Sequence, residues 1–241
     1  MSSEDTAKSS IFIRNASVII LLLMPIAALG TRFGIWPFTI GLLMFAVSML
    51  GSVLIQITNA IWLFRKPASG TTSALRWASL FAFPPLIIVA VTLTNMSKGY
   101  PPIHNISTDR ENPPQFTEAA TQRGSDSNPL EYSSELASVQ HSAYPDLSTV
   151  LSNDSVVETY EKALALCLEN GWDVYGKSPE KGLIEAVDTT FWFGFKDDIV
   201  IRIQATETGS KMDLRSVSRV GVSDVGVNAN RIRQFVASFK S

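Results

Sequence analysis

The sequence has few of the residue types on which many enzymes and metal sites depend. Its 241 residues include one cysteine, Cys167, and two histidines, His104 and His141. A single cysteine excludes an intramolecular disulfide. Cys167 falls on the apolar side of a predicted helix, where a buried thiol is inert. The histidines stand far apart in loop-like sequence, so the pattern predicts neither a metal site nor a cofactor.

Charge is also scarce, because 17% of the residues are charged and 46% are hydrophobic. It is distributed unevenly. Residues 1–97 contain six basic and two acidic side chains, whereas residues 98–241 contain fourteen basic and twenty acidic ones. An acidic half with scattered Lys and Arg repels a phosphate backbone, so nucleic acid is not an expected partner.

Long uncharged runs predict a transmembrane anchor over residues 1–98, with the lipid bilayer as partner. Spans are expected at about residues 15–31, 37–64 and 74–96, close to or above the roughly 20 residues that a bilayer requires. The third contains Pro84-Pro85, which predicts a kink. Apart from Arg76 at the start of the third span, no ionisable residue lies inside the spans, which favours helix packing over transport.

Two further groups of residues support this anchor. Small residues on the second span predict close helix packing: Gly41, Ala46, Ser48, Gly51 and Ser52. Aromatic residues near the predicted span ends indicate an interfacial belt: Trp36, Trp62, Trp77 and Tyr100.

The basic residues that flank the spans predict the orientation of the chain. They are Lys8 and Arg14 before the first span, and Arg65, Lys66 and Arg76 around the loop between the second and third. These segments are expected to be cytoplasmic, which places the N-terminus inside and the C-terminal domain in the periplasm of a bacterial inner membrane. Ala28-Leu29-Gly30 also fits a weak signal-peptidase site, and cleavage there would leave the domain on the same side.

The remaining chain predicts an extended segment and a soluble α+β domain. Residues 99–146 are rich in Pro, Ser, Asn, Gln and Thr and are read as a tether or as extended chain docked on the domain. In residues 147–241, Ser155 to Glu158 has the form of a capping box that opens a helix ending at Asn170-Gly171. Four strands and a last helix follow, so a mostly antiparallel sheet of four or more strands packed with two helices is expected. The strands are predicted over residues 172–176, 183–190, 198–205 and 212–220.

The densest polar chemistry lies on the last predicted strand. Alternation puts Asp213, Arg215 and Arg219 on one face and Ser216 and Ser218 on the other. Arg202 and Gln204 are expected beside the arginine row. Guanidinium groups in a row suit a carboxylate or phosphate, as on a lipid headgroup or an acidic glycan. The alternative is an arginine ladder paired with Glu185, Asp188 and Asp213 on an exposed sheet face.

No arrangement in the sequence spells out a reaction, so no catalytic residue is assigned. Ser216 and Ser218 lack a nucleophile elbow or a neighbouring base, and Asp197-Asp198 stands in a predicted turn. The aromatic run Phe191 to Phe195 is interpreted as a core strand that enters a turn. An apolar pocket or a membrane contact are the alternatives for this run.

Several motifs resemble the family known as domain of unknown function 1499. They are Ile103 to Asp109 with Asn112-Pro113-Pro114, Tyr144-Pro145-Asp146, and Asp213 to Gly221 with Ser223 to Arg233. The resemblance covers about residues 103–239. It implies that the first half of the extended segment belongs to the domain and that the setting is the bacterial envelope. It implies no established activity. Asn105 and Val222 stand where an acidic and a basic residue are expected.

The leading hypothesis is a non-catalytic, membrane-tethered envelope module that binds a partner protein, lipid headgroup or acidic ligand. The residues predicted to bind are Arg202, Arg215, Arg219, Asp213, Ser216, Ser218 and Asp188. An enzyme acting on an envelope lipid or glycan is the first alternative. The second is an accessory subunit of a membrane complex, which would dock through the small residues of the second span.

Overall fold

The computed structural model describes residues 3–65 and 69–241, so Lys66, which contributed to the predicted orientation, lies outside the described residues. The chain divides into two compact units. One contains Met1–Lys98 with Phe191–Gly194, and the other contains Gly99–Thr190 with Phe195–Ser241.

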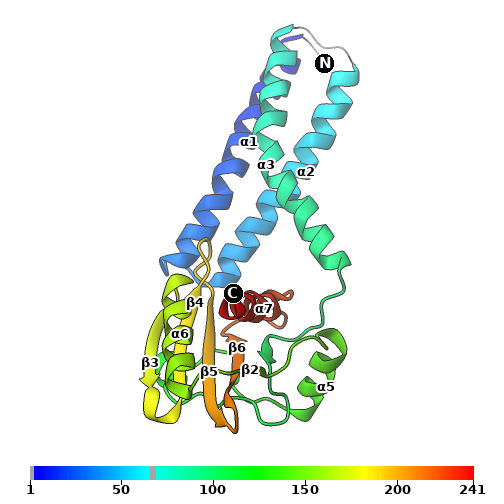
Figure 1. Cartoon of the computed structure of the whole chain (residues 1–241). Coiled ribbons are helices and arrows are strands. Elements are labelled where there is room, and N and C mark those ends of the chain that lie inside the picture. The colour runs from blue at the N-terminus through cyan, green and yellow to red at the C-terminus, as the bar shows by residue number, and fades with distance from the viewer. Residues whose placement is uncertain (1–2, 66–68) are drawn as a thin grey trace. The chain divides into compact units, whose positions relative to one another are not determined.

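Three helices form the first unit: α1 (Ser3–Arg32), α2 (Phe38–Phe64) and α3 (Ser69–Ser97). All three are long and apolar enough to cross a membrane, which confirms the predicted N-terminal apolar helices. They pack against one another pairwise (Figure 1). Both Pro84 and Pro85 lie within the single helix α3.

Small residues bring α2 close to α1. A Cβ atom on Gly41 would lie 1.9 Å from Thr31 Oγ1, and one on Gly51 would lie 2.4 Å from Ile20 Cδ1. Backbones approach this closely only where side chains are small. Ala46 differs from the expectation because it is exposed. The glycines of α2 thus serve packing inside the bundle.

The second unit is built on one antiparallel sheet in the order β1-β6-β5-β4-β3, with β2 also paired to β6. The strands are β1 (Asn105–Ser107), β2 (Val150–Ser152), β3 (Asp173–Ser178), β4 (Leu183–Thr189), β5 (Lys196–Thr206) and β6 (Gly209–Ser218). The α+β class is therefore confirmed. The four predicted strands correspond to β3 to β6, whereas β1 and β2 are too short to give a period-2 signal.

Two helices, α6 (Val156–Glu169) and α7 (Val227–Lys240), pack on one face of this sheet. The capping box at the start of α6 is confirmed: Ser155 Oγ accepts the Glu158 N–H, and the Glu158 carboxylate accepts the Ser155 N–H. Trp172 stacks on Phe235 in the core beneath α7, with ring centroids 5.3 Å apart. This core is apolar and continuous, as a sheet with helices on one face requires.

The segment read as extended chain contains two helices, α4 (Ala119–Gln122) and α5 (Ser134–Ala143). Ser133 Oγ caps α5 by accepting the Leu136 N–H. Gln140 on α5 donates to Ser107 O and accepts the Ser107 N–H. Its amide thereby pairs with the backbone of β1, which fixes this segment to the sheet.

Cys167 lies in the core with no exposed surface. Burial raises the pKa of its thiol to about 12. Since only the thiolate is nucleophilic, Cys167 is unreactive in the folded protein.

Candidate functional site

The predicted alternation along β6 is observed. Met212 and Leu214 face the helices, whereas Asp213, Arg215 and Val217 point to the opposite face. Arg202 on β5 lies directly opposite Asp213 on β6. The row of polar side chains expected from the sequence therefore exists, but this second face of the sheet is covered by residues 105–132 rather than open to solvent.

Arg202 and Asp213 form the first cluster on this covered face. Arg202 Nη2 donates to Asp213 Oδ2 at 3.0 Å and to Asp109 Oδ2 at 2.9 Å. Asp213 Oδ1 accepts the hydroxyls of Thr108 and Thr149. Both oxygens of Asp213 are thus occupied by groups of the domain itself.

Arg219 belongs to a second cluster, centred on Asp198. The Asp198 side chain is fully buried and accepts hydrogen bonds from Arg219 Nη2 and Arg123 Nη1, each at 2.7 Å. Tyr175 also donates to it, at 3.4 Å. Burial lowers the pKa of Arg123, and the nearby charge of Arg219 acts in the same direction, against the attraction of Asp198. One carboxylate therefore holds two cations together.

Arg215 is buried without a carboxylate partner among the described residues. Its guanidinium donates to Asn105 Oδ1, Pro114 O and Leu130 O. The rings of Phe116 and Tyr132 lie 5.3 Å and 5.4 Å from its Cζ atom. Burial lowers the pKa of Arg215 to about 10, so the side chain stays charged at neutral pH.

Glu185, on β4, fixes the start of α4. Its carboxylate accepts the backbone N–H groups of Thr117, Glu118 and Ala119 and the Thr117 hydroxyl. A carboxylate at the free N–H groups of a helix start is favourable for both hydrogen bonding and the helix dipole. The alternative interpretation of the sequence pairs Glu185 with an arginine, whereas in the structure its carboxylate accepts backbone N–H groups and the Thr117 hydroxyl.

The helix-facing side of the sheet carries a polar network of its own. Ser216 and Ser218 both bond to the amide of Asn228, which follows the loop after β6. Asp224 in that loop accepts the N–H groups of Gly226 and Asn228. Burial raises the pKa of Asp224. The two serines are therefore structural partners of the loop, and among the described residues neither hydroxyl bonds to a histidine side chain.

Arg231 on α7 joins this network to the surface. It donates to Asp188 Oδ2, Asp197 Oδ2, Ser216 Oγ and Asn228 Oδ1. These contacts use all five N–H donors of a guanidinium group. The Asp188 side chain is 32% exposed, against 8% for Arg231, so Asp188 is the member that reaches solvent.

A cleft of about 350 Å³ opens beside Asp188. It is lined by Asn170, Trp172, Asp188, Val227, Asn230, Arg231 and Gln234. Among the described residues, the hydrogen bonds of Asp188 all involve Oδ2, the Oδ1 atom of Asn230 accepts a bond from Arg233, and the Gln234 side chain forms none. Acceptors and donors thus remain for a ligand. Asp188 and Arg231 are the only titratable residues of this lining.

A second hollow, of about 270 Å³, lies between α7 and the chain that leads into β2. Its lining is Thr108, Asp146, Leu147, Ser148, Thr149, Val150, Ile232, Arg233, Val236, Ala237 and Lys240. Arg233 there forms a half-exposed pair with Asp146, and this bond lowers the pKa of the Asp146 carboxyl. This hollow has a largely apolar floor.

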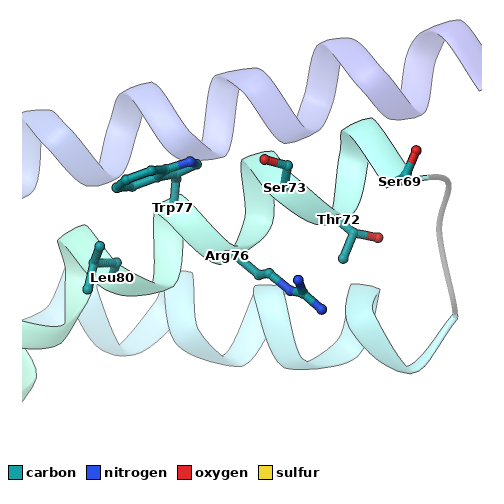
Figure 2. A pocket seen from close by; sticks show the side chains of 6 residues that line it. All are labelled: Ser69, Thr72, Ser73, Arg76, Trp77 and Leu80. Atoms are coloured by element: carbon teal, nitrogen blue, oxygen red, sulfur yellow. The ribbon is translucent and has the colours of Figure 1, made fainter.

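A third hollow, of about 670 Å³, lies along α3 in the helical unit. Figure 2 shows its six lining side chains, all on the first part of α3: Ser69, Thr72, Ser73, Arg76, Trp77 and Leu80. Arg76 and Trp77 are exposed, and Trp77 stacks on Phe81. A cation and an indole ring near the end of a span are typical of an interfacial anchor.

The structure thus separates the seven predicted binding residues. Asp188, Ser216 and Ser218 share the Arg231 network, Arg202 pairs with Asp213, and Arg215 and Arg219 lie apart. Sequence reasoning did not single out Arg231 or Arg123. The position of Arg231 could have indicated its role, because it stands about one helical turn after Asn228 in the Ser223 to Arg233 motif. No sequence feature indicated Arg123, because the polar residues around it resemble a linker.

Among residues 3–65 and 69–241, no group of three or more His, Cys, Asp or Glu side chains is arranged to hold a metal ion. No curated protein matches the chain. The model of a family described as "Protein of unknown function (DUF1499)" matches residues 105–239, which extend from the start of β1 to the penultimate residue of α7. The chain therefore belongs to the DUF1499 family.

Proposed function

We propose that this protein is a non-catalytic binding module of a bacterial cell envelope, held at the inner membrane by α1 to α3. The cleft beside Asp188 is its ligand site. The observation that carries the proposal is the set of unoccupied polar groups in this cleft, next to a network that fixes their positions. Preorganised polar groups in a concave site are the usual basis of small-ligand recognition.

The charge of the site favours a neutral ligand over an acidic one. Arg231 is held by two carboxylates, Asp188 and Asp197, so the cluster carries one excess negative charge. Its guanidinium has no donor left for an anion. The arginines Arg202 and Arg219 are likewise paired inside the domain. An acidic ligand would therefore meet repulsion at this cleft and find no available cation among its lining residues.

A hydroxyl-rich ligand such as a neutral glycan segment fits these groups. Sugar hydroxyls donate and accept, and the cleft offers the free Asp188 oxygen, the Asn230 amide nitrogen and both ends of the Gln234 amide. Acid–base catalysis would need a second free titratable group within reach of the ligand. The lining provides none besides Asp188 and Arg231, which supports binding rather than hydrolysis.

The ligand proposal is tested with the full chain in lipid nanodiscs and a panel of neutral and acidic oligosaccharides. We expect a neutral oligosaccharide to bind, and Asn230→Ala/Gln234→Ala to weaken it by roughly 10-fold to 100-fold, since each lost hydrogen bond contributes about 1 kcal/mol. Gln204→Ala is the matched control, because Gln204 is an exposed amide on β5. Unchanged affinity in the double variant, or binding of acidic sugars alone, would contradict the proposal. Release of a shorter sugar would support the enzyme alternative.

The orientation belongs to the same proposal. Arg65 after α2 and Arg76 on α3 support a cytoplasmic loop, and an odd number of spans then places the domain in the periplasm. Alkaline phosphatase fused after Ser241 is expected to be active, and the same enzyme fused after Arg65 inactive. If the phosphatase is active only in the Arg65 fusion, the orientation is the opposite of the one proposed.

A further inference from the structure

The turn between β4 and β5 exposes large aromatic side chains. Phe191 is 71% and Trp192 56% exposed, and both stand at the tip of the hairpin. The base of the turn is closed by hydrogen bonds in which the Thr190 N–H donates to Phe195 O and the Phe195 N–H to Thr190 Oγ1. The tip is therefore an ordered turn. It belongs to the helical unit, where Arg32 Nη1 of α1 donates to Phe191 O and Arg32 Cζ lies 5.6 Å from the Phe191 ring centroid. Large apolar rings that stay in water forgo the free energy of burial.

Strand register places this tip at the edge of the sheet where the chain arrives from α3. Asp197, at the start of β5, pairs with Ser218, at the end of β6. The Ser218 N–H in turn donates to His104 O, just before β1. Neighbouring strands are about 4.8 Å apart, so three spacings separate β4 from β1 by about 15 Å. The tip and the arriving chain thus lie on one short edge.

The connection from the membrane helix to this edge is very short. Helix α3 ends at Ser97, and Pro101 O already accepts a hydrogen bond from Ser223 Oγ of the domain. Four residues reach at most about 14 Å. The point at which the chain enters this edge therefore lies within about 14 Å of the end of α3.

The loop after β6 adds apolar side chains to the same edge. Val222 is 75% and Val225 48% exposed. Their loop bonds to the arriving chain, since the Asp224 N–H donates to Ile103 O. Exposed apolar side chains from two separate loops thus gather where the chain leaves the membrane.

We propose that this edge, formed by Phe191, Trp192, Val222 and Val225, inserts into the interfacial layer of the membrane that α1 to α3 cross. Its partner is the lipid surface. Aromatic rings are favoured at the depth of the lipid headgroups, because a ring there leaves water while its polar edge stays hydrated. This inference is independent of the ligand cleft and requires only that the helices span the membrane.

The test uses single-cysteine labels on the full chain in phosphatidylcholine vesicles. Native Cys167 is buried with a pKa of about 12, so an introduced cysteine is modified selectively at neutral pH. An environment-sensitive fluorophore is placed at Trp192→Cys. Leu151→Cys is the matched control, because Leu151 is 74% exposed on β2, beside the opposite end of β6.

We expect lipids that carry a shallow spin label to quench the fluorophore at position 192 and to leave the one at 151 bright. Iodide in the aqueous phase should quench the fluorophore at position 151 and leave the one at 192 bright. Iodide quenching at 192 without lipid quenching would overturn the proposal. Protection from both quenchers would also overturn it, because the tip would then be covered by protein. If Trp192→Cys fails to fold, Val222→Cys reports on the same edge with the same criteria.

Discussion

Arg215→Ala is expected to destabilise the second unit by about 3–5 kcal/mol, because it leaves buried acceptors without donors at about 1–3 kcal/mol each and opens a cavity. Those acceptors, Asn105 Oδ1, Pro114 O and Leu130 O, belong to three stretches of the covering segment. The midpoint of thermal unfolding should fall by roughly 10 °C or more. Near-ultraviolet circular dichroism of the full chain in detergent measures it without interference from the helical signal of α1 to α3.

Arg233→Ala is the matched control for this variant. Arg233 pairs with Asp146 at the surface, with side-chain exposures of 38% and 52%. Exposed pairs contribute roughly 0–1 kcal/mol, so the control should unfold close to the wild-type temperature. If Arg215→Ala unfolds as close to the wild-type temperature as Arg233→Ala does, the buried guanidinium does not hold the covering segment to the sheet.

Asp198→Asn is expected to have the second-largest effect, again about 3–5 kcal/mol, because removing one partner of a buried ion pair leaves a charge uncompensated. Here two charges are left, since Arg123 and Arg219 share the one carboxylate. The substitution keeps the shape of the side chain, so the loss measures charge rather than volume. Chemical denaturation followed by near-ultraviolet circular dichroism provides the free energy of unfolding.

Asp173→Asn removes the same charge at an exposed position on β3 and should change stability by no more than about 0.5 kcal/mol. Adding Arg123→Met to Asp198→Asn should recover part of the loss, because it removes one of the two uncompensated cations. Equal stability of Asp198→Asn and the wild type would contradict this account of the cluster.

Local signals predicted the regular elements of the fold well. The uncharged runs gave α1 to α3, and the capping box from Ser155 to Glu158 gave the start of α6. Alternation along β6 separated Arg215 from Ser216 correctly. These features depend on residues near one another in sequence, which is why pattern alone reveals them.

The surroundings of the site could not be predicted in the same way. Whether a row of arginines faces solvent depends on what covers it, and here the cover comes from Asn105 to Tyr132, about a hundred residues earlier. That stretch is rich in Pro, Ser and Asn and has little hydrophobic periodicity. Glu185 and Arg215 hold this stretch by bonding to its backbone, and Asp198 holds it by pairing with Arg123. Bonds of this kind leave no recognisable pattern in the covering sequence.

The pairing of β1 with β6 also determines when the domain can fold. Ser107 pairs with Arg215, so the first strand of the sheet is synthesised 108 residues before its partner. At 5–20 residues per second, this strand waits roughly 5–20 s, while the membrane helices ahead of it are already complete. During that interval the segment that later covers the charged face has nothing to bind. The sheet therefore cannot take up β1 and β2 until β6 is made, and a chain that stops short of β6 leaves both strands without their partner.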